Sequence, residues 1–111
     1  MSTELIVSFE IDGLHFWPNA PKQYEEFSHP HRHLFKIVCF LPVTIKKESD
    51  RPVELWEFRQ TVIEWVTKIY GNPAQFDVLS CEGLSNLLLK EFHLSKCYVF
   101  EDSSHGAVSY A

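Results

Sequence analysis

Three histidines lie within five positions of the sequence, at His29, His31 and His33, where the apolar pattern of a strand begins. In a strand, residues i and i+2 point to the same face about 6.6 Å apart. Two imidazoles at that spacing can reach one metal ion with bonds of roughly 2.0–2.1 Å. Such a pair would supply two ligands of a metal site. The alternative is a polar strand end at which the histidines are solvated. The spacing alone fits His31 with His33 or His29 with His31.

His15 is the candidate for a third ligand. It shares the alternation of Phe9 and Ile11 and follows the end of the first expected strand, which should pair with the strand that begins at His31. Three imidazoles would then meet at one end of a sheet. A set of three histidines leaves one coordination position for water or substrate, as in catalytic zinc sites, where the metal polarises an oxygen and lowers its pKa.

The elements that must position these histidines follow from the hydrophobic pattern. Apolar and polar residues alternate over 4–12, and β-branched and aromatic residues fill 31–43, so both segments are expected to be strands. Apolar residues at steps of three and four predict a helix from Val53 to near Gly71. A second helix is expected to begin around Ser80, whose hydroxyl can cap free amides.

The rest of the chain completes one architecture. Two short strands are expected over 96–101 and 106–110, and residues 13–28, with their glycine, prolines and polar run, should form a long loop. The order ββααββ predicts an α+β fold in which a four-stranded antiparallel sheet carries two helices on one face. No linker or shift in composition divides residues 1–111, so we expect one domain.

Composition excludes several classes of function. The formal charge is -5 and the sequence has no cluster of lysine or arginine, which disfavours nucleic acid as a partner. The longest apolar run, Ile37 to Val43, is far shorter than the ~20 residues that span a bilayer, so no membrane association is expected. Three widely spaced cysteines without a Cys-x-x-Cys pair, together with the lack of an export signal, favour a cytoplasmic protein.

Two of these segments resemble the 6-pyruvoyl- and 6-carboxy-tetrahydropterin synthases, whose T-fold subunits have the order ββααββ. The family's first strand reads approximately FxFxAAH, and residues 9–15 match it with the histidine in place. Its second strand opens HGHNYxV, and residues 31–37 match its histidine spacing and its aromatic and apolar positions. The family's three histidines bind zinc. The resemblance carries this role onto His15, His31 and His33.

A third segment of the resemblance lies towards the C-terminus. The family has a helix that starts thr-ala-glu-asn, and later a strand ending in a glutamate that anchors the amide and amino edge of the pterin. Residues 80–83 and 97–102 stand in those places, so the resemblance makes Glu101 a substrate-binding residue. A carboxylate that accepts two parallel N–H bonds suits a guanine-like heterocycle. Without the resemblance, Glu101 is an ordinary charge at the end of a hairpin.

The chain departs from the family where the family performs catalysis. Synthases use a cysteine before the histidine pair as the base, and no cysteine lies between His15 and His31. Some members use a glutamate instead, a role that Glu25 or Glu26 could fill; the alternative is that both are solvated loop residues. The family's Asp-His pair after the first long helix has no histidine to match it in residues 69–77.

Two functions from different classes follow from this comparison. The resemblance implies a zinc-dependent synthase acting on dihydroneopterin triphosphate or a related pterin, assembled as a homo-oligomer of three or six subunits. The missing cysteine and Asp-His pair favour the alternative, a catalytically degenerate T-fold module that binds a pterin or guanine-like heterocycle without turnover. A third interpretation is a small structural domain whose histidines are incidental.

Overall fold

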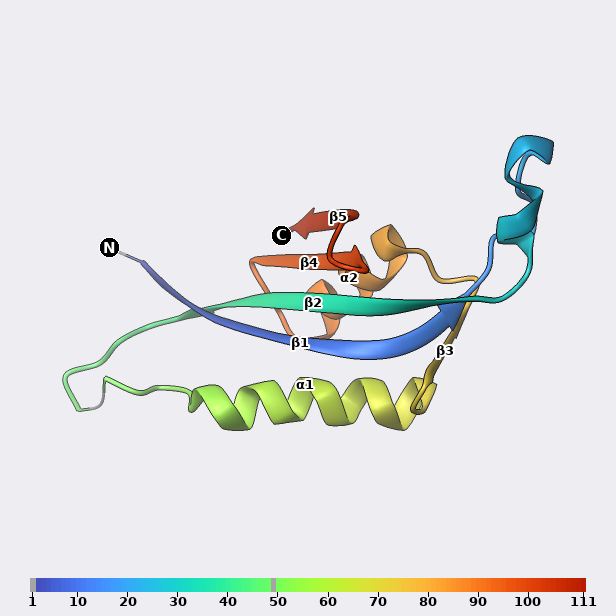
Figure 1. The fold of residues 1–111 in the computed structure, drawn as a ribbon. Coiled ribbons are helices and arrows are strands. Elements are labelled where there is room, and N and C mark those ends of the chain that lie inside the picture. The colour runs from blue at the N-terminus through green and yellow to red at the C-terminus, as the bar shows by residue number, and fades with distance from the viewer. Residues whose placement is uncertain (1, 49) are drawn as a thin grey trace.

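Two long antiparallel strands run through the whole molecule. The computed structural model describes residues 2–48 and 50–111. In it β1 (Thr3–His15) and β2 (His31–Val43) pair along their full length, from Thr3 opposite Val43 to His15 opposite His31 (Figure 1). The sequence predicted both strands, and β1 runs three residues beyond the expected end at residue 12. That extension brings His15 into the sheet.

Both helices form where the sequence predicted them. α1 (Leu55–Tyr70) ends at Gly71, whose φ of 88° lies in the region that favours glycine, and whose N–H bonds the carbonyl of Thr67. α2 (Cys81–Glu91) begins after Ser80, whose hydroxyl accepts the N–H of Gly83 at 3.1 Å. This cap fixes the start of α2 beside the histidine end of the sheet.

The remaining strands widen the sheet on both sides. β4 (Lys96–Glu101) pairs antiparallel with β2, and β5 (His105–Tyr110) pairs antiparallel with β4. The α+β fold class is confirmed, with one correction to the strand count. A fifth strand, β3 (Ala74–Asp77), pairs parallel with β1 and gives the order β3-β1-β2-β4-β5. The four residues of β3 alternate between buried and exposed, but so short a pattern, directly after Gly71, Asn72 and Pro73, did not predict a strand.

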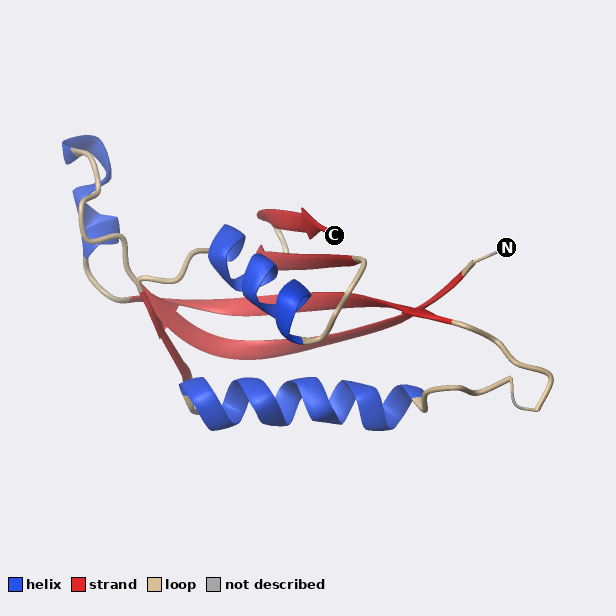
Figure 2. Cartoon of the chain, turned by 180° about the vertical axis from the view of Figure 1, so that it is seen from behind, coloured by secondary structure: helices blue, strands red, loops and turns tan. Residues whose placement is uncertain are grey.

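Both helices lie on one face of the sheet, as Figures 1 and 2 show from opposite sides, and the hydrophobic core lies between them and that face. Alternate residues of β1, β2 and β4 supply the sheet side, as the period of a strand requires. These buried residues are Val7, Phe9, Phe35, Ile37, Cys39, Cys97 and Val99. The helix side is supplied by Phe58, Val62, Val66, Leu84 and Leu88.

The other face of the sheet carries no helix within the described residues. The alternation of the strands directs a second set of apolar side chains to it. Ile6, Leu34, Val108 and Tyr110 are 41–66% exposed there. Burial of exposed apolar surface lowers free energy, so this face is suited to contact with another protein surface.

Gly13 leaves room for two aromatic side chains of the core to pack against β1 at the histidine end of the sheet. It lies opposite His33 in β2 and beside Ala74 in β3. A Cβ atom at this position would lie 2.7 Å from Cε2 of Phe76 and 3.0 Å from Cδ2 of Phe35. A larger residue would displace these two rings, which pack against each other at a centroid distance of 5.0 Å.

The segment between β1 and β2 extends beyond the end of the sheet (Figure 1). The sequence predicts a loop over 13–28. In the structure β1 takes the first three of these residues, and Lys22–Ser28 forms a 3-10 helix, η1. Among the described residues, no helix combines the length and the apolar character needed to cross a membrane.

Candidate metal centre

His15, His31 and His33 converge at the end of the β1–β2 ladder. His15 lies directly opposite His31 and diagonally across from His33, because residues i and i+2 of a strand share a face. One ring nitrogen from each histidine lies within 4.8 Å of the other two. The ring centroids are 4.7 Å apart for His15 and His31, 5.2 Å for His15 and His33, and 5.0 Å for His31 and His33.

Hydrogen bonds to backbone carbonyls orient two of these rings. Nδ1 of His15 lies 3.1 Å from the carbonyl oxygen of Leu79, in the connection before α2, and Nδ1 of His31 lies 2.9 Å from the carbonyl oxygen of His29. A carbonyl only accepts, so each Nδ1 donates its proton, and in the neutral form of either ring the lone pair is on Nε2. Burial lowers the pKa of His15, which favours the neutral imidazole that a metal needs.

Asp102 orients the third ring. Its Oδ2 accepts the Nδ1 proton of His33 at 2.7 Å, and its Oδ1 accepts the N–H of Leu34 at 2.8 Å. These hydrogen bonds, with that from Leu34 contributing most, lower the pKa of Asp102. An ionised carboxylate behind an imidazole fixes its tautomer and makes it a stronger metal ligand. All three histidines therefore present Nε2, which is the arrangement that fits a bound metal ion.

Glu101 lies against the same nitrogens. Its Oε1 is 3.3 Å from Nε2 of His15, and its Oε2 is 3.5 Å from Nε2 of His33 and 3.1 Å from Nε2 of His105. The Sγ of Cys81 lies 3.5 Å from Oε1. Burial, followed by the charge of Glu101, raises the pKa of Cys81 to about 12, so this thiol is protonated at neutral pH. It donates to Glu101.

The other residues proposed from the sequence lie elsewhere. Glu25 and Glu26 are exposed on η1, and in the described part of the chain no hydrogen bond or ion pair joins either carboxylate to the histidines. Their catalytic role stays a prediction. His29 contributes its carbonyl to the orientation of His31, whereas the nitrogens that converge belong to His15, His31 and His33. The geometry thus favours His31 with His33 over His29 with His31.

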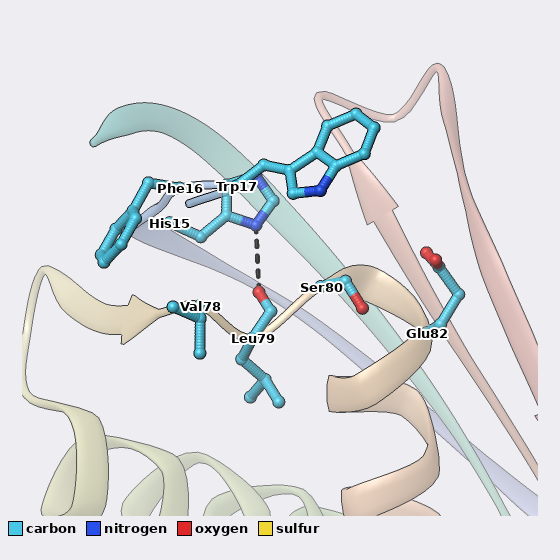
Figure 3. A pocket seen from close by; sticks show the side chains of 7 residues that line it. All are labelled: His15, Phe16, Trp17, Val78, Leu79, Ser80 and Glu82. Atoms are coloured by element: carbon cyan, nitrogen blue, oxygen red, sulfur yellow. Dashed lines mark hydrogen bonds between the residues drawn. The ribbon is translucent and has the colours of Figure 1, made fainter. Parts of the chain in front are cut away.

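A cavity of about 480 Å³ opens beside His15 (Figure 3). The indole of Trp17 lies on one side of it, and Ser80 and Glu82 at the start of α2 lie across from it. Trp17 is 47% exposed and stacks on the ring of Tyr24 at a centroid distance of 6.0 Å. A mainly apolar cavity of this size with a few polar groups can hold a planar small molecule.

Three contributors to the site were missed by the sequence analysis. Asp102 directly follows the last strand residue, a place from which it could be expected to reach β2. The carbonyl of Leu79 carries no sequence signal, because every residue has one. Trp17 lies in the segment that was interpreted as a loop, and its aromatic neighbours at 24 and 27 were the only indication of an ordered arrangement.

The element order, the helices on one face of the sheet and the histidine cluster at its end define a T-fold chain. Comparison with solved structures finds the same fold in 6-pyruvoyl tetrahydropterin synthase from Caenorhabditis elegans, with a TM-score of 0.68. The alignment covers 100% of this chain and 96% of that chain, at 10% sequence identity. No family model and no curated protein matches the sequence. The suspected relationship is therefore confirmed at the level of the fold.

Asp102→Asn tests the orientation of His33. The variant keeps an oxygen for the N–H of Leu34 but cannot accept the Nδ1 proton of His33 if its amide nitrogen takes the place of Oδ2. We expect affinity for a divalent metal ion to fall about 10–100-fold, measured by competition with a chromophoric chelator. Asp12→Asn is the control, because Asp12 pairs with Arg32 at 2.8 Å on the same strands, and among the described residues no hydrogen bond or ion pair joins it to the three histidines. Equal affinities in the two variants would contradict the role of Asp102.

Proposed function

We propose that this chain is a zinc-binding T-fold protein that holds a pterin or guanine-like heterocycle beside the metal. The observation that carries the proposal is the convergence of three imidazoles whose Nδ1 protons are all bound by oxygen acceptors. Zinc prefers nitrogen ligands of this kind, and sites with three histidines are typical of catalytic zinc. When bound, zinc would act as a Lewis acid towards an oxygen of the ligand.

The cavity beside His15 supports the proposed binding of a heterocycle. The exposed indole of Trp17 offers a face on which a planar ring can stack, and the hydroxyl of Ser80 offers a polar contact. The carboxylate of Glu101 is the acceptor proposed for paired N–H groups of the ring, from the resemblance to the synthases. It lies beside His15, so a ligand held by Glu101 would also lie beside the metal.

Two candidate functions share this site. In the first, the chain is a zinc-dependent synthase acting on dihydroneopterin triphosphate or a related pterin, with Glu25 or Glu26 as the base. In the second, it binds the heterocycle without turnover. The exposed positions of both glutamates and the lack of a cysteine between His15 and His31 favour binding without turnover.

Zinc content tests the metal site directly. We expect the purified protein to hold about one zinc per chain, and His31→Ala and His33→Ala to lose it, because each removes one of three nitrogen ligands. His29→Ala is the matched control and should retain zinc, since its carbonyl is unchanged by the substitution. Elemental analysis of the four proteins gives the answer. Equal, near-zero zinc in all four proteins would show that the proposed metal site does not exist.

Ligand binding and turnover on one zinc-saturated sample separate the two candidate functions. Glu101→Ala should weaken binding of neopterin or guanine about 10–100-fold, or roughly 1.5–3 kcal/mol, because it removes a charged acceptor. Calorimetry measures this change. We expect no turnover of dihydroneopterin triphosphate; an ordinary enzymatic rate would establish the synthase instead. Glu25→Gln and Glu26→Gln would then identify the base.

The open sides of the sheet give a reason to expect that several copies of the chain assemble. The exposed apolar face and the edge strands β3 and β5 can be covered by further copies of the chain. We propose a homo-oligomer, and the resemblance to the synthases suggests three or six subunits. Light scattering coupled to gel filtration should give a multiple of 13.0 kDa. A mass of one chain at every concentration would reject the assembly.

A further inference from the structure

The cavity beside His15 is lined by a carboxylate. Glu82 borders it from the first turn of α2, across from the indole of Trp17 (Figure 3). A second carboxylate, that of Glu101, lies 3.3 Å from Nε2 of His15. A molecule held beside His15 and Trp17 therefore meets acidic surroundings, and its own charge affects how well it binds.

The start of α2 would otherwise attract an anion. The first N–H groups of a helix have no partner within the helix, and they favour phosphate and other negative groups. Here the chain supplies its own acceptor and its own charge. The hydroxyl of Ser80 accepts the N–H of Gly83 at 3.1 Å, and Glu82 is the acidic residue of the first turn. A phosphate at this position would compete with Ser80 and lie against Glu82.

Basic side chains lie away from the cavity. All ten lysines and arginines of the sequence are among the described residues, and none of them lines it. Arg32 follows His31 but lies on the other face of the sheet, where it pairs with Asp12 at 2.8 Å. Lys90 is in the last turn of α2, at the opposite end of the helix from Glu82. The cavity therefore lacks the lysine or arginine that commonly binds a phosphate.

The groups that line the cavity favour a different ligand. The face of an indole is negative, and it attracts cations and the positive edges of planar rings. Carboxylates accept hydrogen bonds from N–H groups, and their charge strengthens these bonds. A phosphate would instead lie against like charge. Zinc held by the three histidines would attract a phosphate, but Glu101 lies against His15 and His33 and offsets part of that attraction.

We infer that the ligand of this site is a planar, N–H-bearing heterocycle that carries no phosphate group. The inference rests on the proposed heterocycle site and narrows its ligand to an unphosphorylated pterin or guanine derivative. It departs from the substrate that the resemblance to the synthases implies, since dihydroneopterin triphosphate is strongly anionic.

Two matched pairs of probes test the inference on the zinc-saturated full chain. Guanosine and guanosine monophosphate differ by one phosphate, as do dihydroneopterin and its monophosphate. In calorimetry we expect each phosphorylated probe to bind at least about tenfold more weakly than its partner, because like charges repel. Added salt should reduce this difference, since salt screens the repulsion. Elemental analysis after the titration establishes that the zinc is retained.

Charge variants locate the effect. Glu82→Gln should strengthen binding of the phosphorylated probes about two- to fivefold, the range typical of exposed charges, and leave the unphosphorylated probes unchanged. Glu91→Gln is the matched control, because it removes an exposed carboxylate at the other end of the same helix. Lys22→Gln removes the lysine at the start of η1 and should weaken binding of none of the probes. Circular dichroism establishes that each variant is folded.

Three results would overturn the inference and leave the heterocycle site in place. These are phosphorylated probes that bind as tightly as their partners, phosphorylated probes that lose affinity in Lys22→Gln or in added salt, and an unchanged preference in Glu82→Gln. Failure of the proposed function gives a different result, because then none of the four probes binds to the zinc-saturated chain. That result would overturn both proposals together.

Discussion

The hydrogen-bonded ladder between β1 and β2 determines where the three histidines of the candidate site lie. Side chains alternate between the faces of a strand, so a shift of register by one residue would move His15 to the opposite face from its present partners. The same shift would expose Val7 and Phe9, which are buried against the helices. The free energy of the core therefore holds the three histidines on one face of the sheet, and the hydrogen bonds to Leu79, His29 and Asp102 then orient their rings.

Two acidic residues at the end of β4 contact the histidine cluster. Glu101 and Asp102 are adjacent in the chain, and they approach His33 through different atoms, one at Nε2 and the other at Nδ1. Each of these contacts places an acidic side chain against an imidazole, so one turn supplies both of the carboxylates that face His33. The turn after β4 thus matters for the site as much as the strands that bear the histidines.

Much of this arrangement could be predicted from the sequence because it depends on local patterns. Strand alternation and helix periodicity gave the element order, and the parity of His15 with Phe9 and Ile11 indicated which face it would occupy. The contacts that orient the histidines could not be predicted in this way. They are made by a carbonyl at Leu79 and by a carboxylate at Asp102, whose approach depends on how α2 and β4 pack on the sheet.

The strand β3 illustrates the same limit. Its four residues pair with the last residues of β1, and that pairing exists only because α1 returns the chain to the histidine end of the sheet. No pattern inside Ala74–Asp77 specifies such a partner. The exposed positions of Glu25 and Glu26 could not be predicted either. Both lie on η1, where the rings of Tyr24 and Phe27 stack, and no periodic pattern in the sequence indicates this arrangement.

Gly13 sets a condition for moving this site into another protein. Grafting two strands with three histidines onto a different sheet would reproduce the ligands but not the close approach of Phe35 and Phe76 beneath them. A recipient scaffold with any larger residue two positions before the first histidine would push those rings aside and tilt the imidazoles they support, since Phe35 contacts both His15 and His33. The smallest portable unit therefore includes a glycine and a short parallel edge strand, although neither supplies a ligand.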